Sequence, residues 1–185
     1  LALFADTGIA NVPLRRIADV AGVTPALVTY YFGNKEQLVA SVIEERVLPA
    51  FVQGLGAVAL SPADALVPNF IAGVSALVAR NPWLPGLWVR EILTEGGALR
   101  ELLLERIAPA LPRALAQRFA EQQRLGTLNA ELDPRLLVVS MIGLTLFVHA
   151  AQPVWSRIFD ASDITAEQLQ RHTLALLARG LGSPP

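Results

Sequence analysis

Polar and aromatic side chains gather between residues 24 and 35, and their types are suited to contacting a nucleic acid. Thr24 and Pro25 open a predicted helix, where free backbone N–H groups and the helix dipole favour a phosphate. Ala26 could meet a thymine methyl group, and Thr29 could reach a base edge or a phosphate. The candidate DNA contacts are Arg15, Thr24, Pro25, Ala26, Thr29, Tyr30, Tyr31 and Lys35.

Several of these residues also have a simpler interpretation. Thr24 can serve as a helix cap alone. The hydroxyl groups of Tyr30 and Tyr31 need polar partners, which phosphates supply, but Tyr31 could instead pack in the core of a small domain. Lys35 lies in the first turn of the next helix, where the dipole disfavours a cation, so it indicates a nearby anion unless it is only solvated.

Direct reading of bases is expected to be modest. The helix from residue 25 to 32 contains no Arg, Lys, Asn or Gln, the side chains that read bases in bidentate fashion. Arg15, at the start of the preceding helix, is the residue best suited to such a contact. Part of the specificity would then depend on DNA shape.

A helix-turn-helix would position these side chains. The sequence predicts helices at 1–7, 13–21 and 25–32, with Gly8 in a left-handed conformation and Gly22 in the turn. On the second helix, Ile17, Val20 and Ala21 are expected to share the buried face. Asn34 caps a further helix, with Gln37 in capping-box register, that runs to residue 49 or beyond.

This pattern resembles the signature of TetR-family transcriptional regulators. The resemblance covers most of residues 1–46 and is carried by these segments: Leu3-Phe4, Gly8, Ile17-Ala18, Ala21-Gly22-Val23-Thr24, Val28, Tyr31-Phe32-Gly33-Asn34-Lys35-Glu36 and Leu38. Pro13 departs from the family's usual Ser or Thr cap. The resemblance implies a homodimer, a small-molecule pocket in the C-terminal part, and a phosphate contact by Lys35.

The remaining sequence predicts an all-α fold. Expected helices span 62–80, 87–95, 98–124, 134–152 and 165–180, separated by Gly- and Pro-containing breaks. We expect a helix-turn-helix domain at 1–46, whose first helix lacks its start, and a helical ligand-binding and dimerisation domain at 47–185.

Composition narrows the class of protein. With 53% hydrophobic and 17% charged residues among 185, the chain can fill a core and cover a partner surface. The absence of cysteine excludes disulfides and thiolate metal sites, and fits a cytoplasmic location. A net charge of −1 means that DNA affinity must come from a few well-placed cations and helix ends. The charge-free stretch 136–156 is interpreted as a helix buried on most faces, not a membrane span.

The C-terminal part offers candidate ligand contacts and a candidate interface. Aromatic and polar side chains that could line a cavity are Phe70, Trp88, Glu91, Met141, Thr145 and His149. The helices at 134–152 and 165–180 are too apolar for one small domain to bury completely. A two-fold four-helix interface between two copies would cover both.

Together these features favour a ligand-responsive transcriptional regulator. It would bind a near-palindromic operator on double-stranded DNA as a homodimer, most simply as a repressor released by a small apolar or amphipathic effector. The alternative is an all-α small-molecule-binding or interaction protein without productive DNA binding. No cofactor, metal or catalytic residue is expected, because His149 and His172 lack metal-ligand spacing and no nucleophile motif occurs.

Overall fold

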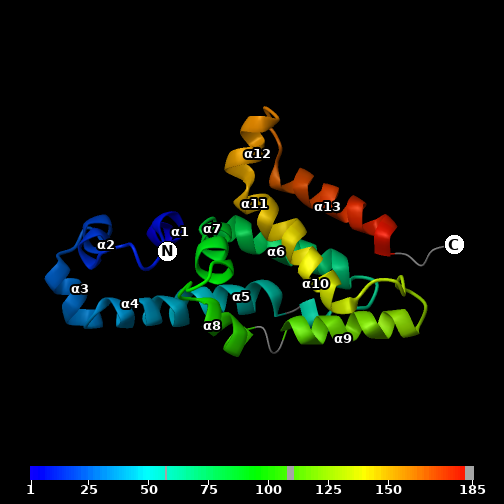
Figure 1. Ribbon diagram of the computed structural model, residues 1–185, viewed down its shortest axis with the longest axis horizontal. Coiled ribbons are helices and arrows are strands. Elements are labelled where there is room, and N and C mark those ends of the chain that lie inside the picture. Colours follow the sequence, from blue (N-terminus) through cyan, green and yellow to red (C-terminus); the bar gives the residue numbers. More distant parts are fainter. Residues whose placement is uncertain (57, 108–110, 182–185) are drawn as a thin grey trace.

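The computed structural model describes residues 1–56, 58–107 and 111–181, and these form helices joined by turns, as the sequence predicts. The molecule is elongated, with the N-terminal helices at one end and the C-terminal helices at the other (Figure 1). The predicted domain 47–185 includes residues 57, 108–110 and 182–185, which lie outside the described part of the chain.

After α1 (Ala2–Thr7), the chain forms a small helix-turn-helix unit. It consists of α2 (Leu14–Ala21), α3 (Pro25–Phe32) and the start of α4, which begins at Lys35. Ala18, Val28 and Leu38 form the buried centre of this unit. Gly22, at φ 68° and ψ 27°, makes the predicted left-handed turn between α2 and α3. Gly8 has a positive φ of 87°, but its ψ of 145° is not that of the expected left-handed helical conformation.

The predicted buried face of α2 is partly wrong. Ala18 is fully buried and Ile17 packs beside it, whereas Val20 is 58% exposed and Ala21 is also exposed. Val20 lies two residues beyond Ala18, which places it about 200° around the helix and away from α3. The small side chain of Ala18 lets α2 and α3 cross closely.

One continuous helix links the helix-turn-helix to the C-terminal domain. It comprises α4 (Lys35–Val42), a π-helical turn (Ile43–Val47) and α5 (Leu48–Leu55), so it runs past Pro49 as predicted. In the π-turn, Leu48 N–H bonds the carbonyl of Ile43, five residues earlier. Pro49 lacks an N–H group, and a wider turn is one way for a helix to accommodate a proline. The predicted boundary between residues 46 and 47 therefore falls inside this linker helix.

The C-terminal helices differ from prediction mainly at their ends. A 3-10 turn (Val58–Leu60) precedes α6, and the remaining elements are α6 (Leu66–Arg80), α7 (Leu84–Leu87) with a π-turn (Trp88–Leu93), α8 (Arg100–Leu102) with a π-turn (Leu103–Ile107), and α9 (Leu111–Arg124). The predicted helix 98–124 is therefore two helices, and its residues 108–110 lie outside the described part. The helix expected to begin at residue 87 begins at Leu84, since Pro85 is acceptable in a first turn.

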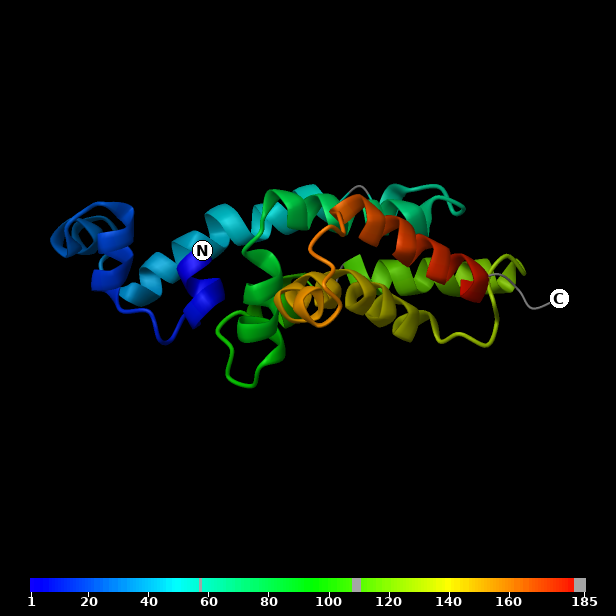
Figure 2. The ribbon, with the colours of Figure 1, turned by 90° about the horizontal axis from the view of Figure 1, so that it is seen from above.

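The last helices form a bent arm and a covering helix. They are α10 (Pro134–Ile142), a π-turn (Gly143–Phe147), α11 (Val148–Ala150), α12 (Gln152–Ile158) and α13 (Ala166–Leu181). Pro153 ends the long helix as expected, but it also opens α12, which the sequence did not predict. The two parts of this arm meet at 71°. In Figures 1 and 2, α13 runs back along the C-terminal end, above α9 and α10.

A single large core joins the N-terminal helix to the C-terminal domain. It is centred on α6, where Phe70, Ile71 and Leu77 are almost completely buried, and it includes Phe4 of α1. Helix α1 packs on α7, and a Cβ atom added at Gly86 would lie 3.3 Å from the carbonyl oxygen of Ala5. The first helix therefore packs with the C-terminal domain.

Among the described residues, no single helix has the length and apolarity needed to cross a bilayer. The segments Pro134–Ala150 and Gln152–Ile158 reach that length only as a pair, and they are bent relative to each other.

Candidate nucleic-acid interface and ligand cavities

Helix α3 presents its first turn at the far end of the molecule (Figure 1). Thr24 caps it, because the hydroxyl oxygen accepts a hydrogen bond from Leu27 N–H at 3.2 Å, and Pro25 occupies the first turn as predicted. Val28 is buried, while Ala26 and Thr29 are exposed. The hydroxyl of Thr29 donates to the carbonyl of Pro25 at 3.1 Å, which leaves its oxygen free to accept.

The two tyrosines stand in solvent. Tyr30 is 81% exposed and Tyr31 is 71% exposed, so the alternative that Tyr31 packs in the core is wrong. Their ring centroids lie 5.3 Å apart at an interplanar angle of 84°. This edge-to-face contact holds two phenol groups together on the outer surface of α3.

Lys35 is anchored within the protein. Its Nζ donates a hydrogen bond to the carbonyl oxygen of Ala10 at 2.8 Å, and the side chain is half-buried. The alternative of a merely solvated lysine is therefore wrong. The bond ties the start of α4 to the loop between α1 and α2, and an ammonium group has two further N–H donors for an anion. Asn34 caps α4, accepting from Gln37 N–H at 2.8 Å.

Apolar side chains that were not predicted as exposed lie at the same end of the molecule. Val20, Val23 and Leu27 are exposed beside the helix-turn-helix turn, although each reads as core by residue type. The available signal was the shortness of α3, because a helix of two turns that buries Val28 and Phe32 leaves Leu27 on another face. Arg15 is exposed on the first turn of α2.

Glu91 has a different role from the predicted ligand contact, because its carboxylate accepts hydrogen bonds from the protein's own backbone. The side chain is only 5% exposed. Its Oε1 accepts from Ile9 N–H at 2.6 Å, and its Oε2 accepts from Ala98 N–H at 3.0 Å. A Cβ atom at Gly97 would lie 2.4 Å from the carbonyl oxygen of Glu91, so this approach requires glycine. We call this arrangement the Glu91 bridge, because it joins the α1–α2 loop to the C-terminal domain.

The other predicted ligand residues do not gather around one cavity. Phe70 and Met141 are core residues, and the hydroxyl of Thr145 donates to the backbone of its own helix. Trp88 packs against Phe51, with ring centroids 6.4 Å apart. His149 lines a separate cavity of about 250 Å³, and burial lowers the pKa of its imidazole.

A larger and mostly apolar cavity of about 620 Å³ lies between α6, α9 and α13. Val67, Phe119 and Leu177 contribute apolar walls, and Asp64 and Gln122 contribute polar groups. Its size and lining are those of a small-molecule site. No sequence pattern predicts this cavity, since its walls come from helices distant along the chain.

Comparison with known proteins relates the N-terminal helices to a family. Residues 1–42 match the family model described as "Bacterial regulatory proteins, tetR family". No curated protein matches the chain.

Three solved structures illustrate the likeness in fold. The ketosteroid transcriptional regulator KstR2 of Mycobacterium tuberculosis is 17% identical at a TM-score of 0.77, with 99% of this chain and 91% of that chain covered. AibR in complex with isovaleryl coenzyme A and operator DNA is 20% identical at a TM-score of 0.73, covering 94% and 91%. NalD of Pseudomonas aeruginosa, the secondary repressor of the MexAB-OprM multidrug efflux pump, is 23% identical at a TM-score of 0.65, covering 97% and 91%. With its helix-turn-helix, linker helix and C-terminal helical domain, this chain shares the fold of these regulators, and its residues 1–42 match the N-terminal domain of the TetR family of bacterial regulatory proteins.

Proposed function

We propose that the protein is a ligand-responsive repressor that binds a near-palindromic operator as a homodimer. The observation that carries this proposal is the exposed, capped N-terminal turn of α3 at the end of an elongated molecule. A helix in this position can enter the major groove with its first residues at the base edges.

The proposed DNA contacts divide by chemistry. Thr24, Tyr30, Tyr31 and Lys35 would meet phosphates, and Ala26 would lie against a base edge. Pro25 and Thr29 would lie beside Ala26 in the groove, and Arg15 would reach from α2. Exposure of the tyrosines and the fixed start of α3 support this division.

The proposed dimer uses the faces of α10 and α13. Leu136, Val139 and Phe147 lie on α10 and its π-turn and are more than half exposed, as is Leu176 on α13. This helix was expected to be buried on most of its faces, but these side chains are exposed. A second copy of the chain would cover them. Two copies joined there would present two recognition helices to one duplex.

The proposed effector is apolar or amphipathic and occupies the cavity between α6, α9 and α13. Its apolar walls suit such a molecule. Relatives in fold include one described as a ketosteroid regulator and one solved with isovaleryl coenzyme A. Ligand binding would bias the angle of the linker helix, with a coupling free energy on the order of 1–3 kcal/mol.

The decisive experiment selects DNA sequences with the purified chain and measures their affinity by fluorescence anisotropy. Ala26→Glu places a carboxylate at the proposed groove surface and should abolish binding. Ala76→Glu, at an exposed alanine of α6, is the matched control and should leave binding intact. If no sequence is selected even at low salt, the alternative of a binding protein without productive DNA binding replaces this proposal.

Salt dependence provides a second measurement on the same complex. Arg15, Arg16 and Lys35 give each protomer three candidate phosphate-neutralising cations within residues 1–42. For a dimer, the slope of log affinity against log salt should be no steeper than about −5. A much steeper slope would mean that other cations carry the contact.

A further inference from the structure

The first turn of α3 carries an apolar side chain that faces solvent. Leu27 is 43% exposed, although leucine is a residue type that usually fills a core. It precedes the buried Val28 by one residue, so it is turned about 100° around the helix from the side that faces the core. Its backbone N–H is the group that donates to the hydroxyl of Thr24, at 3.2 Å. The N-cap therefore holds Leu27 in a defined position at the outer end of the molecule.

The side chains next to Leu27 offer little polar chemistry for reading a base. Ala26 is exposed and ends in a methyl group, which lets α3 come close to another surface. Thr29 donates its hydroxyl to the backbone carbonyl four residues earlier, at 3.1 Å, so its one donor is engaged. Tyr30 offers a single hydroxyl, farther along the helix. With no Arg, Lys, Asn or Gln in this helix, α3 lacks the paired groups that recognise guanine or adenine.

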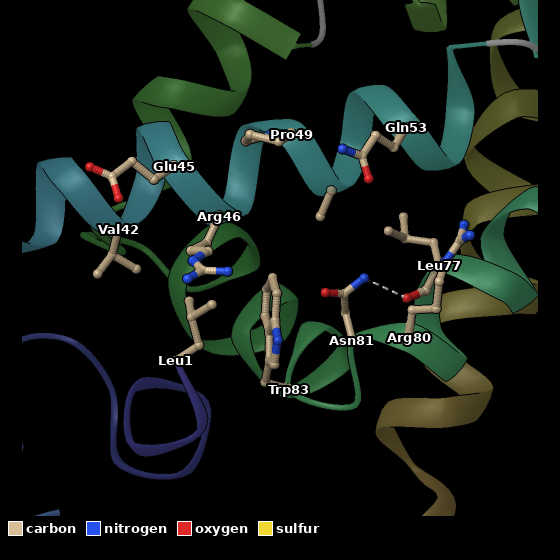
Figure 3. Close-up of a pocket in the computed structure, with 11 residues that line it drawn as sticks. Leu1, Val42, Glu45, Arg46, Pro49, Gln53, Leu77, Arg80, Asn81 and Trp83 are labelled. Carbon is tan, nitrogen blue, oxygen red and sulfur yellow. Dashed lines mark hydrogen bonds between the residues drawn. The ribbon is translucent and has the colours of Figure 1, made fainter. Parts of the chain in front are cut away.

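The cations of the N-terminal region lie on other helices than α3. Arg15 and Arg16 belong to α2, and Lys35 begins α4. The next cation along the chain is Arg46. Figure 3 shows it beside Trp83, where the linker helix meets the C-terminal domain, beyond the far end of α4. Base recognition by α3 itself therefore has to depend mainly on apolar contact.

The groups around Leu27 indicate that DNA is the surface that covers it. Thr24 accepts the cap bond through its hydroxyl oxygen, which leaves the hydroxyl hydrogen for a phosphate. Tyr30 lies three residues after Leu27, a spacing that brings side chains together on one side of a helix, and it is 81% exposed. A duplex bound through these two hydroxyls removes Leu27 from water, and this burial stabilises the complex.

We propose that Leu27 recognises the methyl group at carbon 5 of a pyrimidine in the major groove. Thymine carries this methyl group beside its O4 acceptor, and apolar side chains contact it there. The inference rests on the proposed DNA binding, and it adds the residue and the chemical group that set operator specificity. A cytosine methylated at carbon 5 presents the same group. Leu27 therefore accepts methylated cytosine where it rejects cytosine.

Replacing thymine by uracil in the selected operator tests this contact. Uracil pairs with adenine and keeps the O4 acceptor, but it lacks the methyl group. At the position that faces Leu27, replacement in both half-sites should weaken binding by about 16-fold, or about fourfold for each methyl group removed. A bidentate contact from Arg15 to guanine does not respond to this change. Fluorescence anisotropy on operators with uracil at one position at a time measures the effect.

Leu27→Ala assigns the effect to this side chain. The ratio of thymine to uracil affinity should fall below about twofold in each half-site, because the methyl group is no longer buried against an isobutyl group. Both DNAs are measured on the same protein sample, so a partly unfolded sample does not change the ratio. Leu125→Ala, at an exposed leucine after α9, should keep the ratio of the parent protein.

Cytosine methylation provides an independent measurement at the same position. A C·G pair there should bind more weakly than T·A. Methylation of that cytosine should recover about fourfold in affinity per half-site in the parent protein, and nothing in Leu27→Ala.

Three results would overturn the proposal while DNA binding itself stands. They are equal binding of thymine and uracil at every position of the half-site, a ratio in Leu27→Ala equal to that of the parent, and no gain on cytosine methylation. Failure to select any operator at low salt would instead refute the proposed function, and this inference with it.

Discussion

The side chains of α3 explain how a chain with net charge −1 could hold DNA. Thr24 fixes the first turn, and the neighbouring phenol groups provide neutral hydrogen-bond donors in place of cations. Neutral donors to phosphate cost less desolvation than charges, and they give a weaker salt dependence.

Removing the phenol hydroxyls tests this idea at single residues. Tyr30→Phe and Tyr31→Phe should each weaken operator binding by about 2- to 10-fold, the worth of one hydrogen bond. Because both rings are exposed, the free energy of unfolding should change by less than about 0.5 kcal/mol. Anisotropy and urea titration measure the two quantities. Ser162→Ala, at an exposed hydroxyl near α13, serves as the control. Unchanged DNA affinity in both variants would exclude the phenol contacts.

His149 gives stability a dependence on pH. Burial lowers the pKa of its imidazole below 6.5, so the folded protein binds this proton less readily than the unfolded chain. The contribution of neutral His149 to the free energy of unfolding is therefore complete above about pH 6.5. It is lost as the pH falls through the lowered pKa of the folded state.

Substitution of His149 should make the free energy of unfolding depend less on pH. Between pH 7.5 and pH 5.5, His149→Gln should lose less unfolding free energy than the parent. The difference should be below about 1.4 kcal/mol, because the ring is only partly buried. Urea unfolding at the two pH values measures it, and His172→Gln, at an exposed position, is the control. Identical pH dependence in parent and His149→Gln would contradict the assignment.

At the scale of elements, the Glu91 bridge holds the α1–α2 loop against the C-terminal domain. One carboxylate satisfies two backbone N–H groups that lie 89 residues apart in the chain, at Ile9 and Ala98. Lys35 holds the next residue of the same loop, Ala10, from the other side. The loop that precedes the helix-turn-helix is thus fixed from both directions.

Loss of this bridge should destabilise the protein markedly. Glu91→Ala should lower the free energy of unfolding by about 3 kcal/mol, because two hydrogen bonds to a charged group are lost and a buried N–H is left unpaired. Glu95→Ala, at an exposed glutamate nearby, should change it by less than about 0.5 kcal/mol. Urea unfolding monitored by circular dichroism compares the two. A loss in Glu91→Ala no larger than in the control would show that the bridge is not stabilising.

Elements with local signals were predictable from the sequence. Thr24, Gly22 and Asn34 mark helix ends through bonds within three or four residues, so the bounds of α3 and the start of α4 follow from residue type. The π-turns and α12 were not predicted. They depend on how Pro49 and Pro153 are accommodated, and this is decided by packing as well as by local sequence.

At the scale of the whole molecule, one apolar face of α10 remains exposed to solvent. Val139 is 62% exposed and Phe147 is 65% exposed, on the same long helix as the fully buried Met141. A helix that buries one side and exposes apolar groups on the other is typical of a subunit interface.

A charge on this face should separate the proposed dimer. Val139→Asp should shift the sedimentation coefficient to that of a monomer, and operator affinity should fall because two half-sites are no longer bound together. Leu125→Asp, at an exposed leucine outside this face, should remain dimeric. A parent protein that sediments as a monomer at micromolar concentration would contradict the proposed assembly.

The candidate ligand sites were the least predictable feature. Residue type suggested Phe70, Trp88 and Met141, yet Phe70 and Met141 fill the core and Trp88 packs against it, while the apolar cavity is lined by residues from helices far apart in the chain. The partner of Glu91 at Ile9 is 82 residues away and is a backbone group, so no local pattern marks it. Such contacts depend on tertiary packing.

The uninterrupted helix from Lys35 to Leu55 also constrains how this protein can change in evolution. Adding one residue between its ends would rotate everything beyond it by about 100° and advance it by about 1.5 Å. Insertions and deletions in this segment are therefore tolerated only near multiples of a full turn. When recombination with a relative exchanges one domain, it must preserve the rotation of one end of this helix relative to the other.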